Sequence, residues 1–312
     1  MRGCGYRVRA RSRLQMGWHS PRQLGVGCSL ALLLAVATAT THNAGSAAPV
    51  DIGSFSELNL TVGAGARVIE ITSPEIVFDH QLEVRHARPA LLIESAIGAT
   101  LSGGNRTRLF FLHIGSALSL RGVNLIGGVA SGTSSDPRLL GGAIFVSAGS
   151  ELHLHSARVF DNRAADLGGA IYVMSSTITA TDCTLTSNSA SRGGAVTVEG
   201  NSSVTATDCT LSSNFADQDG AVYFANGNST IISTNCTMTS NSAASGAVYY
   251  AYEHSTIIST NCAMFSNFAY WGGAVYCATG YPTIISTNCT VRRADGRVFI
   301  CAVDGSMPTS RV

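Results

Sequence analysis

Hydrophobic and polar residues alternate in short runs along most of the chain beyond Leu101. Between Ala170 and Asn188, two such runs follow one another with small or polar residues between them. Strict alternation predicts β-strands in which every second side chain faces a common interior. In this segment the predicted inward positions are Ile171, Val173, Ile178, Ala180, Cys183 and Leu185. No repeat contains an amphipathic stretch of helix length, so the pattern predicts a coil made of strands and corners.

Three residue types recur with one period. The second position of a Gly-Gly-Ala-Ile/Val signature repeats every 25 to 27 residues, at Gly142, Gly169, Gly194, Gly220, Gly246 and Gly273. A cysteine column repeats every 26 or 27 residues, at Cys183, Cys209, Cys236, Cys262 and Cys289. An asparagine column does the same at Asn162, Asn188, Asn214, Asn241 and Asn267. We therefore predict an all-β fold, a right-handed parallel β-helix (β-solenoid) of about 26 residues per coil, with equivalent residues ~4.8 Å apart in successive coils.

Each column has a predicted structural role. Glycine allows the backbone to turn at a corner, and stacked asparagines satisfy the amides of another corner. The cysteines alternate inward and are expected to be stacked free thiols, with disulfide bridging as the alternative. Cys277 is expected at the interior position that Val173, Val198, Phe224 and Tyr250 hold in earlier coils, and a pair with Cys301 is its alternative.

The recurring Gly-Gly-Ala-Ile/Val, followed by a Cys-Thr-hydrophobic-x-x-Asn segment, resembles the repeats of chlamydial polymorphic outer membrane proteins and the wider pectin-lyase-like β-helix group. The resemblance covers residues 101–290, with an inserted loop at Ser131–Arg138. It implies the coil strongly and function weakly, since this scaffold carries enzymes, adhesins and structural proteins. The chlamydial proteins continue from their repeats into a membrane-embedded barrel that exports them, and we do not expect that export route for this chain.

The segments that flank the repeats predict three further regions. Residues 1–48 combine an arginine-rich start, an apolar run and small residues, as in a signal peptide. An uncleaved membrane anchor or an organellar transit peptide is the alternative for this segment. Residues 49–100 are expected to form irregular first coils or a cap. Residues 291–312 lose the pattern, which predicts an irregular tail or a truncated gene model.

If the protein is secreted, its number of cysteines and its Asn-x-Ser/Thr sequons can be interpreted. With Cys4 and Cys28 removed alongside a signal peptide, seven thiols remain, an odd number that cannot all pair internally. Six sequons are candidate N-glycosylation sites in a eukaryotic secretory route; they begin at Asn59, Asn105, Asn201, Asn228, Asn235 and Asn288.

Charge argues against a polyanionic partner. Charged residues make up 12% of the chain, and the formal net charge is +1. Six of the 20 basic residues precede the first acidic residue, Asp51, so the remainder carries 14 arginines against 19 acids, formally −5. Because nucleic-acid binding requires a basic stripe, we expect no nucleic-acid partner.

The candidate catalytic and metal-binding residues are few. Asp182 and Asp208 occupy one column in adjacent coils, ~5 Å apart at the backbone, a separation that suits a retaining glycosidase. The column continues as asparagine, which favours a corner-capping role instead. The Asp217-Gln-Asp219 corner is expected to be a solvated turn. His153 and His155 share one side of a strand without a third ligand, so we predict no metal site there. We also predict no cofactor and assign no catalytic group.

Two outward columns are candidate ligand-binding surfaces. The first carries aromatic residues, with Thr197 in one coil, at Phe145, Tyr172, Tyr223, Tyr249 and Tyr276. The second contains Ile232, Ile258 and Ile285, where Thr179 and Thr205 stand in earlier coils. An exposed aromatic stripe would meet sugar rings or a partner protein. Alternatively, like-on-like stacking only stabilises the ladder.

These observations predict a non-enzymatic, secreted or cell-surface β-helix protein that is adhesin-like and presents one face to glycans or cell-surface proteins. The alternatives are a divergent polysaccharide-acting enzyme of the pectin-lyase-like type, with its groove on the first coils or the inserted loop, and a structural component of a wall or coat. Contact with a membrane is expected only through an uncleaved N-terminal segment.

Overall fold

The computed structural model describes residues 50–85, 88–132, 139–278 and 280–292. Every described residue belongs to one compact unit, Ala48–Val312. The predicted targeting segment 1–48, positions 133–138 of the predicted loop, Cys301 and nearly all of the predicted tail lie outside the described residues. Among the described helices, none has the length and apolar character needed to cross a membrane.

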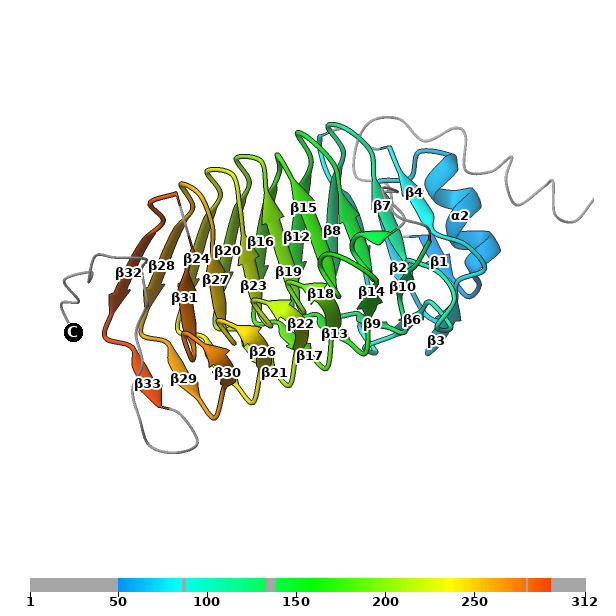
Figure 1. Ribbon diagram of the computed structural model, residues 1–312. Helices are drawn as coiled ribbons and strands as arrows, with labels where there is room; N and C mark the ends of the chain where they lie inside the picture. Colours follow the sequence, from blue (N-terminus) through cyan, green and yellow to red (C-terminus); the bar gives the residue numbers. More distant parts are fainter. Residues whose placement is uncertain (1–49, 86–87, 133–138, 279, 293–312) are drawn as a thin grey trace, which may run out of the picture. The chain divides into compact units, whose positions relative to one another are not determined.

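The described strands form four parallel sheets (Figure 1). Sheet A contains β1 (Val50–Ile52), β2 (Val68–Ile71), β5 (Leu91–Glu94), β8 (Ala117–Arg121), β12 (Glu151–His155), β16 (Thr177–Thr181), β20 (Ser203–Thr207), β24 (Thr230–Thr234), β28 (Thr256–Thr260) and β32 (Thr283–Thr287). Sheet B contains β3 (Glu75–Val77), β6 (Thr100–Ser102), β9 (Asn124–Ile126), β13 (Arg158–Phe160), β17 (Thr184–Thr186), β21 (Thr210–Ser212), β25 (Thr237–Thr239), β29 (Ala263–Phe265) and β33 (Thr290–Arg292).

The other two sheets complete each coil. Sheet C contains β4 (Leu82–Val84), β7 (Phe110–Leu112), β11 (Ile144–Val146), β15 (Ile171–Met174), β19 (Val196–Glu199), β23 (Tyr223–Ala225), β27 (Tyr249–Ala251) and β31 (Val275–Cys277). Sheet D contains β10 (Val129–Ala130), β14 (Arg163–Ala164), β18 (Ser189–Arg192), β22 (Phe215–Asp219), β26 (Ser242–Ser245) and β30 (Phe268–Trp271). In each sheet, successive coils contribute neighbouring strands, which confirms the predicted β-helix of about 26 residues per coil.

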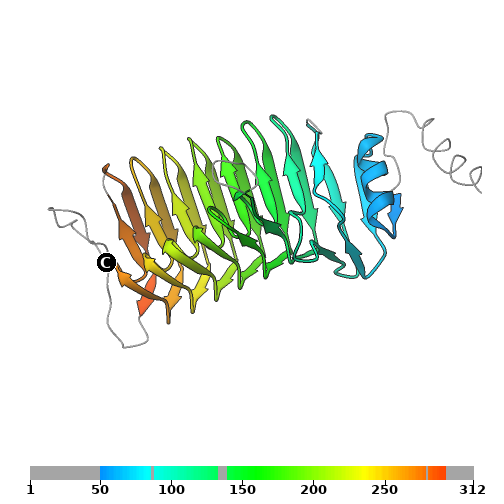
Figure 2. The same cartoon turned by 45° about the vertical axis from the view of Figure 1, so that its right-hand side comes forward.

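A short helix, α2 (Phe55–Gly63), lies at the N-terminal end of the stacked coils, as Figure 2 shows. Ser54 caps it by accepting a hydrogen bond from the backbone of Glu57, whose carboxylate accepts one from the backbone of Gly53. The helix buries Phe55, Leu58 and Val62. Because the first coil would otherwise expose its apolar interior, α2 acts as a cap.

The asparagine ladder forms as predicted at a buried corner. Asn214 shows the pattern: its Nδ2 donates to Leu185 O at 3.0 Å and to Asn241 Oδ1 at 3.1 Å. Its Oδ1 accepts from the backbone N and the Nδ2 of Asn188, at 3.0 and 3.1 Å. Each asparagine therefore satisfies polar groups in the coil before it and the coil after it.

A serine ladder, which the sequence analysis did not identify, lies at another corner. Ser150 Oγ accepts from Ser116 N, Ser176 Oγ from Ser150 N, and Ser202 Oγ from Ser176 N, at 3.1 to 3.2 Å. All four side chains are buried. Serine is common throughout the chain, so this column does not stand out by composition.

The cysteine column is inward, as predicted, and its thiols are not bridged. Each thiol donates to a backbone carbonyl two residues earlier; Cys209 Sγ, for example, lies 3.2 Å from Thr207 O and 3.6 Å from Ala180 O. Hydrogen bonding with the adjacent Cys209 and Cys262 thiols, together with burial, raises the pKa of Cys236. The column therefore behaves as small buried hydrophobes with weak donors.

Replacing one member of the asparagine ladder tests its structural role. Asn214→Ala would leave the backbone N–H of Asn188 and the carbonyl of Leu185 without their partner in a buried corner. We expect the free energy of unfolding to fall by about 3 kcal/mol, measured by urea denaturation with circular dichroism. Thr210→Ala in the same coil removes an exposed side chain and should change it by less than about 0.5 kcal/mol. Equal effects of both substitutions would contradict the ladder's role.

Candidate functional site

An aromatic row runs along the outer side of sheet C. It consists of the positions paired from coil to coil: Phe111, Phe145, Tyr172, Thr197, Phe224, Tyr250 and Tyr276. The Phe111 and Phe145 rings stack with centroids 4.8 Å apart, and those of Tyr250 and Tyr276 lie 5.3 Å apart. Its members therefore contact each other as a continuous stack on either side of Thr197.

The prediction that Tyr223 and Tyr249 belong to this outward row is wrong. Tyr223 pairs with Val196 and with Tyr249, and both tyrosines point into the core, where they are 2% and 1% exposed. Their rings stack at 5.6 Å, and burial raises the pKa of both hydroxyls. Phe224 and Tyr250 hold the outward positions in their place.

The wrong assignment of Tyr223 and Tyr249 arose because the sequence alignment placed Gly220 and Gly246 one residue out of register in the glycine column. Gly220 and Gly246 pair with the first glycine of the signature, represented by Gly193, and all three have positive φ. A Cβ at Gly220 would lie 2.3 Å from Tyr223 O, so glycine is required there. The register of β22 shifts against β18, where an extra residue precedes Gly220. Because strand side chains alternate with period two, one residue reverses every inward and outward assignment that follows.

The same slip corrects the column of Cys277. Its strand neighbour is Ala251, which pairs in turn with Ala225, and Ala225 with Val198. Cys277 therefore shares its buried column with small residues, and Phe224 and Tyr250 are not part of that column.

The aromatic row is largely covered, because residues that precede the glycine corner fold over it. Arg108 is 4% exposed; its guanidinium donates to the carbonyls of Gly141 and Leu140 at 2.9 and 2.7 Å and lies 5.4 Å from the Phe145 ring centroid. Leu167 packs against Phe145 and Tyr172, which are 4% exposed each. Only the first member of the row, Phe111, and its last members, Tyr250 and Tyr276, are half-buried. Most of the row therefore offers no open platform for a sugar ring.

Polar groups gather over the middle of the aromatic row, and we call them the outer-sheet cluster: Asp166, Tyr172, Arg192, Glu199, Asp219 and Asn226. Tyr172 Oη donates to Glu199 Oε2 at 2.7 Å. Arg192 pairs with Asp166 at 3.0 Å, and its guanidinium lies 5.5 Å from the Phe224 ring centroid. The cluster thus joins three coils by charge-assisted contacts.

The environment of the cluster perturbs two of its titratable groups. Burial and then the Glu199 charge raise the pKa of Tyr172, so its hydroxyl stays a donor at physiological pH. Burial also raises the pKa of Asp219, although a hydrogen bond with Ser245 and the Arg192 charge oppose that shift. Asp219 was expected in a solvated turn with Asp217; the structure leaves Asp217 exposed and half-buries Asp219 in register with Arg192.

The candidate carboxylate pair lies elsewhere, at an exposed corner. Asp182 and Asp208 both have left-handed backbone, with φ of 54° and 55°, and the equivalent Asn235, Asn261 and Asn288 share it. Asn235 Nδ2 donates to Asp208 Oδ1 at 3.1 Å. Asp and Asn are the side chains that tolerate this conformation best, so the column has the corner-capping role.

The two candidate metal ligands project from β12. His153 pairs with Thr179 and His155 with Thr181, and His153 Nε2 lies 4.0 Å from Glu151 Oε2. Across the described part of the chain, no group of three His, Cys, Asp or Glu side chains is placed to hold a metal ion.

A flat surface with different chemistry covers the outer side of sheet A. Its outward positions in β16, β20, β24, β28 and β32 form three columns in register. We call this the threonine face: Thr177, Thr179, Thr181, Ser203, Thr205, Thr207, Thr230, Ile232, Thr234, Thr256, Ile258, Thr260, Thr283, Ile285 and Thr287. The predicted isoleucine column is present here, and none of the fifteen residues is charged.

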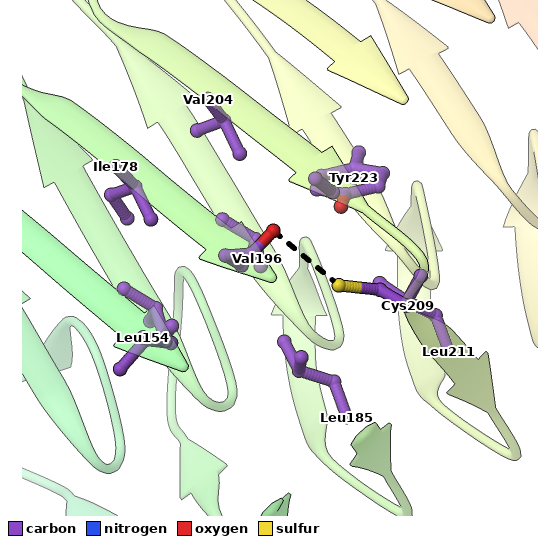
Figure 3. A pocket seen from close by; sticks show the side chains of 11 residues that line it. Leu154, Ile178, Leu185, Val196, Val204, Cys209, Leu211 and Tyr223 are labelled. Atoms are coloured by element: carbon purple, nitrogen blue, oxygen red, sulfur yellow. Dashed lines mark hydrogen bonds between the residues drawn. The ribbon is translucent and has the colours of Figure 1, made fainter. Parts of the chain in front are cut away.

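The cavity that the structure shows inside the coil is too small for a ligand. The core cavity in Figure 3 has a volume of about 10 Å³ and is lined by apolar side chains such as Leu154, Val196 and Tyr223. That is roughly the minimum space for one water molecule. A larger open depression of about 570 Å³ lies on the surface beside Asn105, Asp161 and Arg163.

All six candidate glycosylation residues are exposed: Asn59, Asn105, Asn201, Asn228, Asn235 and Asn288. Asn59 lies on α2, and the other five have positive φ at corners or turns. A glycan at any of them would point away from the packed interior.

The corrected positions of the tyrosines give a direct stability test. Tyr223→Ser would leave a large hole in the core and should lower the free energy of unfolding by about 4 kcal/mol. Tyr270→Ser removes a side chain that is 78% exposed and should have a much smaller effect. Chemical denaturation of both variants measures the difference; equal and small losses would place Tyr223 outside the core.

The raised pKa of Asp219 predicts a pH-dependent contribution to stability. The folded state holds the Asp219 proton more tightly than the unfolded state, in which the pKa has its ordinary value of 3.8. Stability is therefore lost as pH rises from 3.8 through the folded-state pKa. Asp219→Asn removes this loss, so its stability relative to wild type should be greater at pH 7 than at pH 3 in urea unfolding. The same relative stability of Asp219→Asn at pH 3 and at pH 7 would contradict the raised pKa.

The comparison with known families agrees with this architecture. A search of curated proteins finds no match to the chain. The family model described as right handed beta helix region matches residues 135–292, which is half of the sequence. These residues include the whole of the glycine, cysteine and asparagine columns and the whole of the threonine face. The chain belongs to the right-handed β-helix family.

Proposed function

We propose that this protein is a non-enzymatic, secreted or cell-surface β-helix, adhesin-like in character, that binds an extended partner surface through the threonine face. One observation carries the proposal. Fifteen uncharged outward residues stand in three columns across five consecutive coils, all in register. A partner would meet this surface as a repeated pattern of contacts instead of a single pocket.

The chemistry of the threonine face supports binding over a purely structural role. Within the described residues, the side-chain hydroxyls of these columns form no hydrogen bond to protein, whereas Thr186 on sheet B bonds Ser212 at 3.1 Å. They are therefore available to a ligand. Many weak contacts made together give tight binding when their geometry matches the partner.

The location of the protein is part of the proposal. The apolar run in residues 1–48 and the exposed sequons support entry into a secretory route. The likeness to chlamydial polymorphic outer membrane protein repeats, and to the pectin-lyase-like group, supports a surface role by analogy of sequence alone.

A second candidate function rests on the outer-sheet cluster. Tyrosine, arginine and carboxylates lie together on the outer side of sheet C, where Tyr172 contacts Glu199 and Arg192 contacts Asp166. Such a grouping would suit a polysaccharide-acting enzyme. The same contacts also tie the coils together, so we favour the non-enzymatic function.

Binding of full-length protein to a panel of extended surfaces tests the proposal. The panel holds a glycan array, insoluble polysaccharide particles and crystalline surfaces. Thr205→Lys places a charge in the middle column of the threonine face and should weaken binding about tenfold, since each 1.4 kcal/mol lost is a factor of ten. Thr210→Lys, on the outer side of sheet B in the same coil, is the matched control and should bind like wild type.

Two results would overturn the proposal. Binding that Thr205→Lys leaves unchanged on every surface would exclude the threonine face. Turnover of polygalacturonate or alginate that is lost in Glu199→Gln would establish the enzymatic function instead. Circular dichroism of each variant would show that the coil remains folded.

A further inference from the structure

We infer that the partner of the threonine face is the surface of crystalline water, so that the protein binds ice. This inference rests on the proposed function, because it names the partner of the same face. Three properties of the face carry it: a two-dimensional repeat, a composition of hydroxyl and methyl groups without charge, and rigid support from below.

The repeat of the face is set by the β-helix itself. Along the coil axis, equivalent residues such as Thr181 and Thr207 pair directly and repeat at ~4.8 Å, the spacing of hydrogen-bonded strands. Along each strand, outward residues such as Thr205 and Thr207 are two positions apart, which is ~6.6 Å. Hexagonal ice presents oxygen atoms in flat rectangular repeats of this order. A face with regular spacing in both directions can match such a lattice over many cells.

The composition of the face suits water and fits other partners poorly. Eleven threonines each supply one hydroxyl and one methyl group, and one serine and three isoleucines complete the array. An anionic polysaccharide would require basic side chains, and a neutral sugar surface would favour aromatic platforms. The threonine face contains neither. Charged and imidazole side chains occupy its columns only in earlier coils, for example at Arg121, Glu151, His153 and His155.

Rigid support keeps the hydroxyls in place before binding. In the same strands, the alternate residues Ile178, Val204, Ile231 and Ile257 are at most 2% exposed and anchor the sheet to the core. Threonine is β-branched and restricted at χ1, so little side-chain entropy is lost on contact. The serine ladder precedes the strands and the cysteine column follows them, so neighbouring coils are held together at both ends.

Full-length protein tested against ice gives a direct measurement. We expect wild type to separate the freezing and melting points of a single ice crystal, to slow ice recrystallisation, and to partition into a growing polycrystalline ice hemisphere. Thr205→Lys and, independently, Thr234→Lys should reduce the freezing-point separation at a fixed concentration by about tenfold. Thr210→Lys should retain the wild-type value. Circular dichroism near 0 °C controls for folding, and two separate face variants guard against one that misfolds.

The outcomes separate this inference from the proposed function. Ice activity that falls with Thr205→Lys and Thr234→Lys but not with Thr210→Lys supports both. Glycan or polysaccharide binding that depends on the face, without any ice activity, overturns the ice inference and leaves the proposed function standing. Wild type that binds neither ice nor any other surface overturns both. Equal loss of ice activity in Thr210→Lys would exclude the threonine face as the ice-binding surface.

Discussion

The structure depends on one constraint: each coil must hydrogen-bond in register with the coils before and after it. Backbone groups that a single coil cannot satisfy are paired by its neighbours along four parallel sheets. A residue therefore lies between the equivalent residues of the two neighbouring coils, ~4.8 Å away, and in several columns these are of the same type. This favours groups that tolerate such repetition. Asparagine amides bond one another, serine hydroxyls bond backbone amides, and buried thiols pack as small hydrophobes.

Because the coils stack in register, the interior, the outer side of sheet C and the outer side of sheet A each carry their own type of side chain. The interior is mainly apolar. Many of its buried polar groups lie in ladders at the corners, and Ser233, Ser259 and the Tyr249 hydroxyl lie between the sheets. Outside, sheet C carries an aromatic row that Arg108, Leu167 and the outer-sheet cluster cover. On sheet A, the threonine face carries uncharged hydroxyl and methyl groups that no other segment of the described chain hydrogen-bonds. The two outer surfaces thus differ in what remains available to a partner.

That difference changes the functional interpretation. Stacked aromatic residues favoured a sugar-binding stripe on sheet C, but covering residues leave only the two ends of the aromatic row half-exposed. The surface with unused polar groups lies on sheet A, and its regularity follows directly from the register of the coils. A repeating face without charge suits a repeating partner without charge, which links the fold to the proposed recognition of an extended surface and of ice.

The sequence by itself determined the fold, the length of the coil, and the cysteine and asparagine ladders, because the period of these columns survives small changes in loop length. It also placed Ile232, Ile258 and Ile285 outward, since their strands align without insertions. Only the tertiary structure showed that Tyr223 and Tyr249 point inward and that Phe224 and Tyr250 point outward. The reason is an extra residue in β22, which shifts the register before the glycine corner. Alignment of the repeats by residue identity places Val222 opposite Val196. In the structure, strand pairing places Tyr223 opposite Val196. Only three-dimensional packing shows where such a residue is absorbed, and which outward side chains other segments cover.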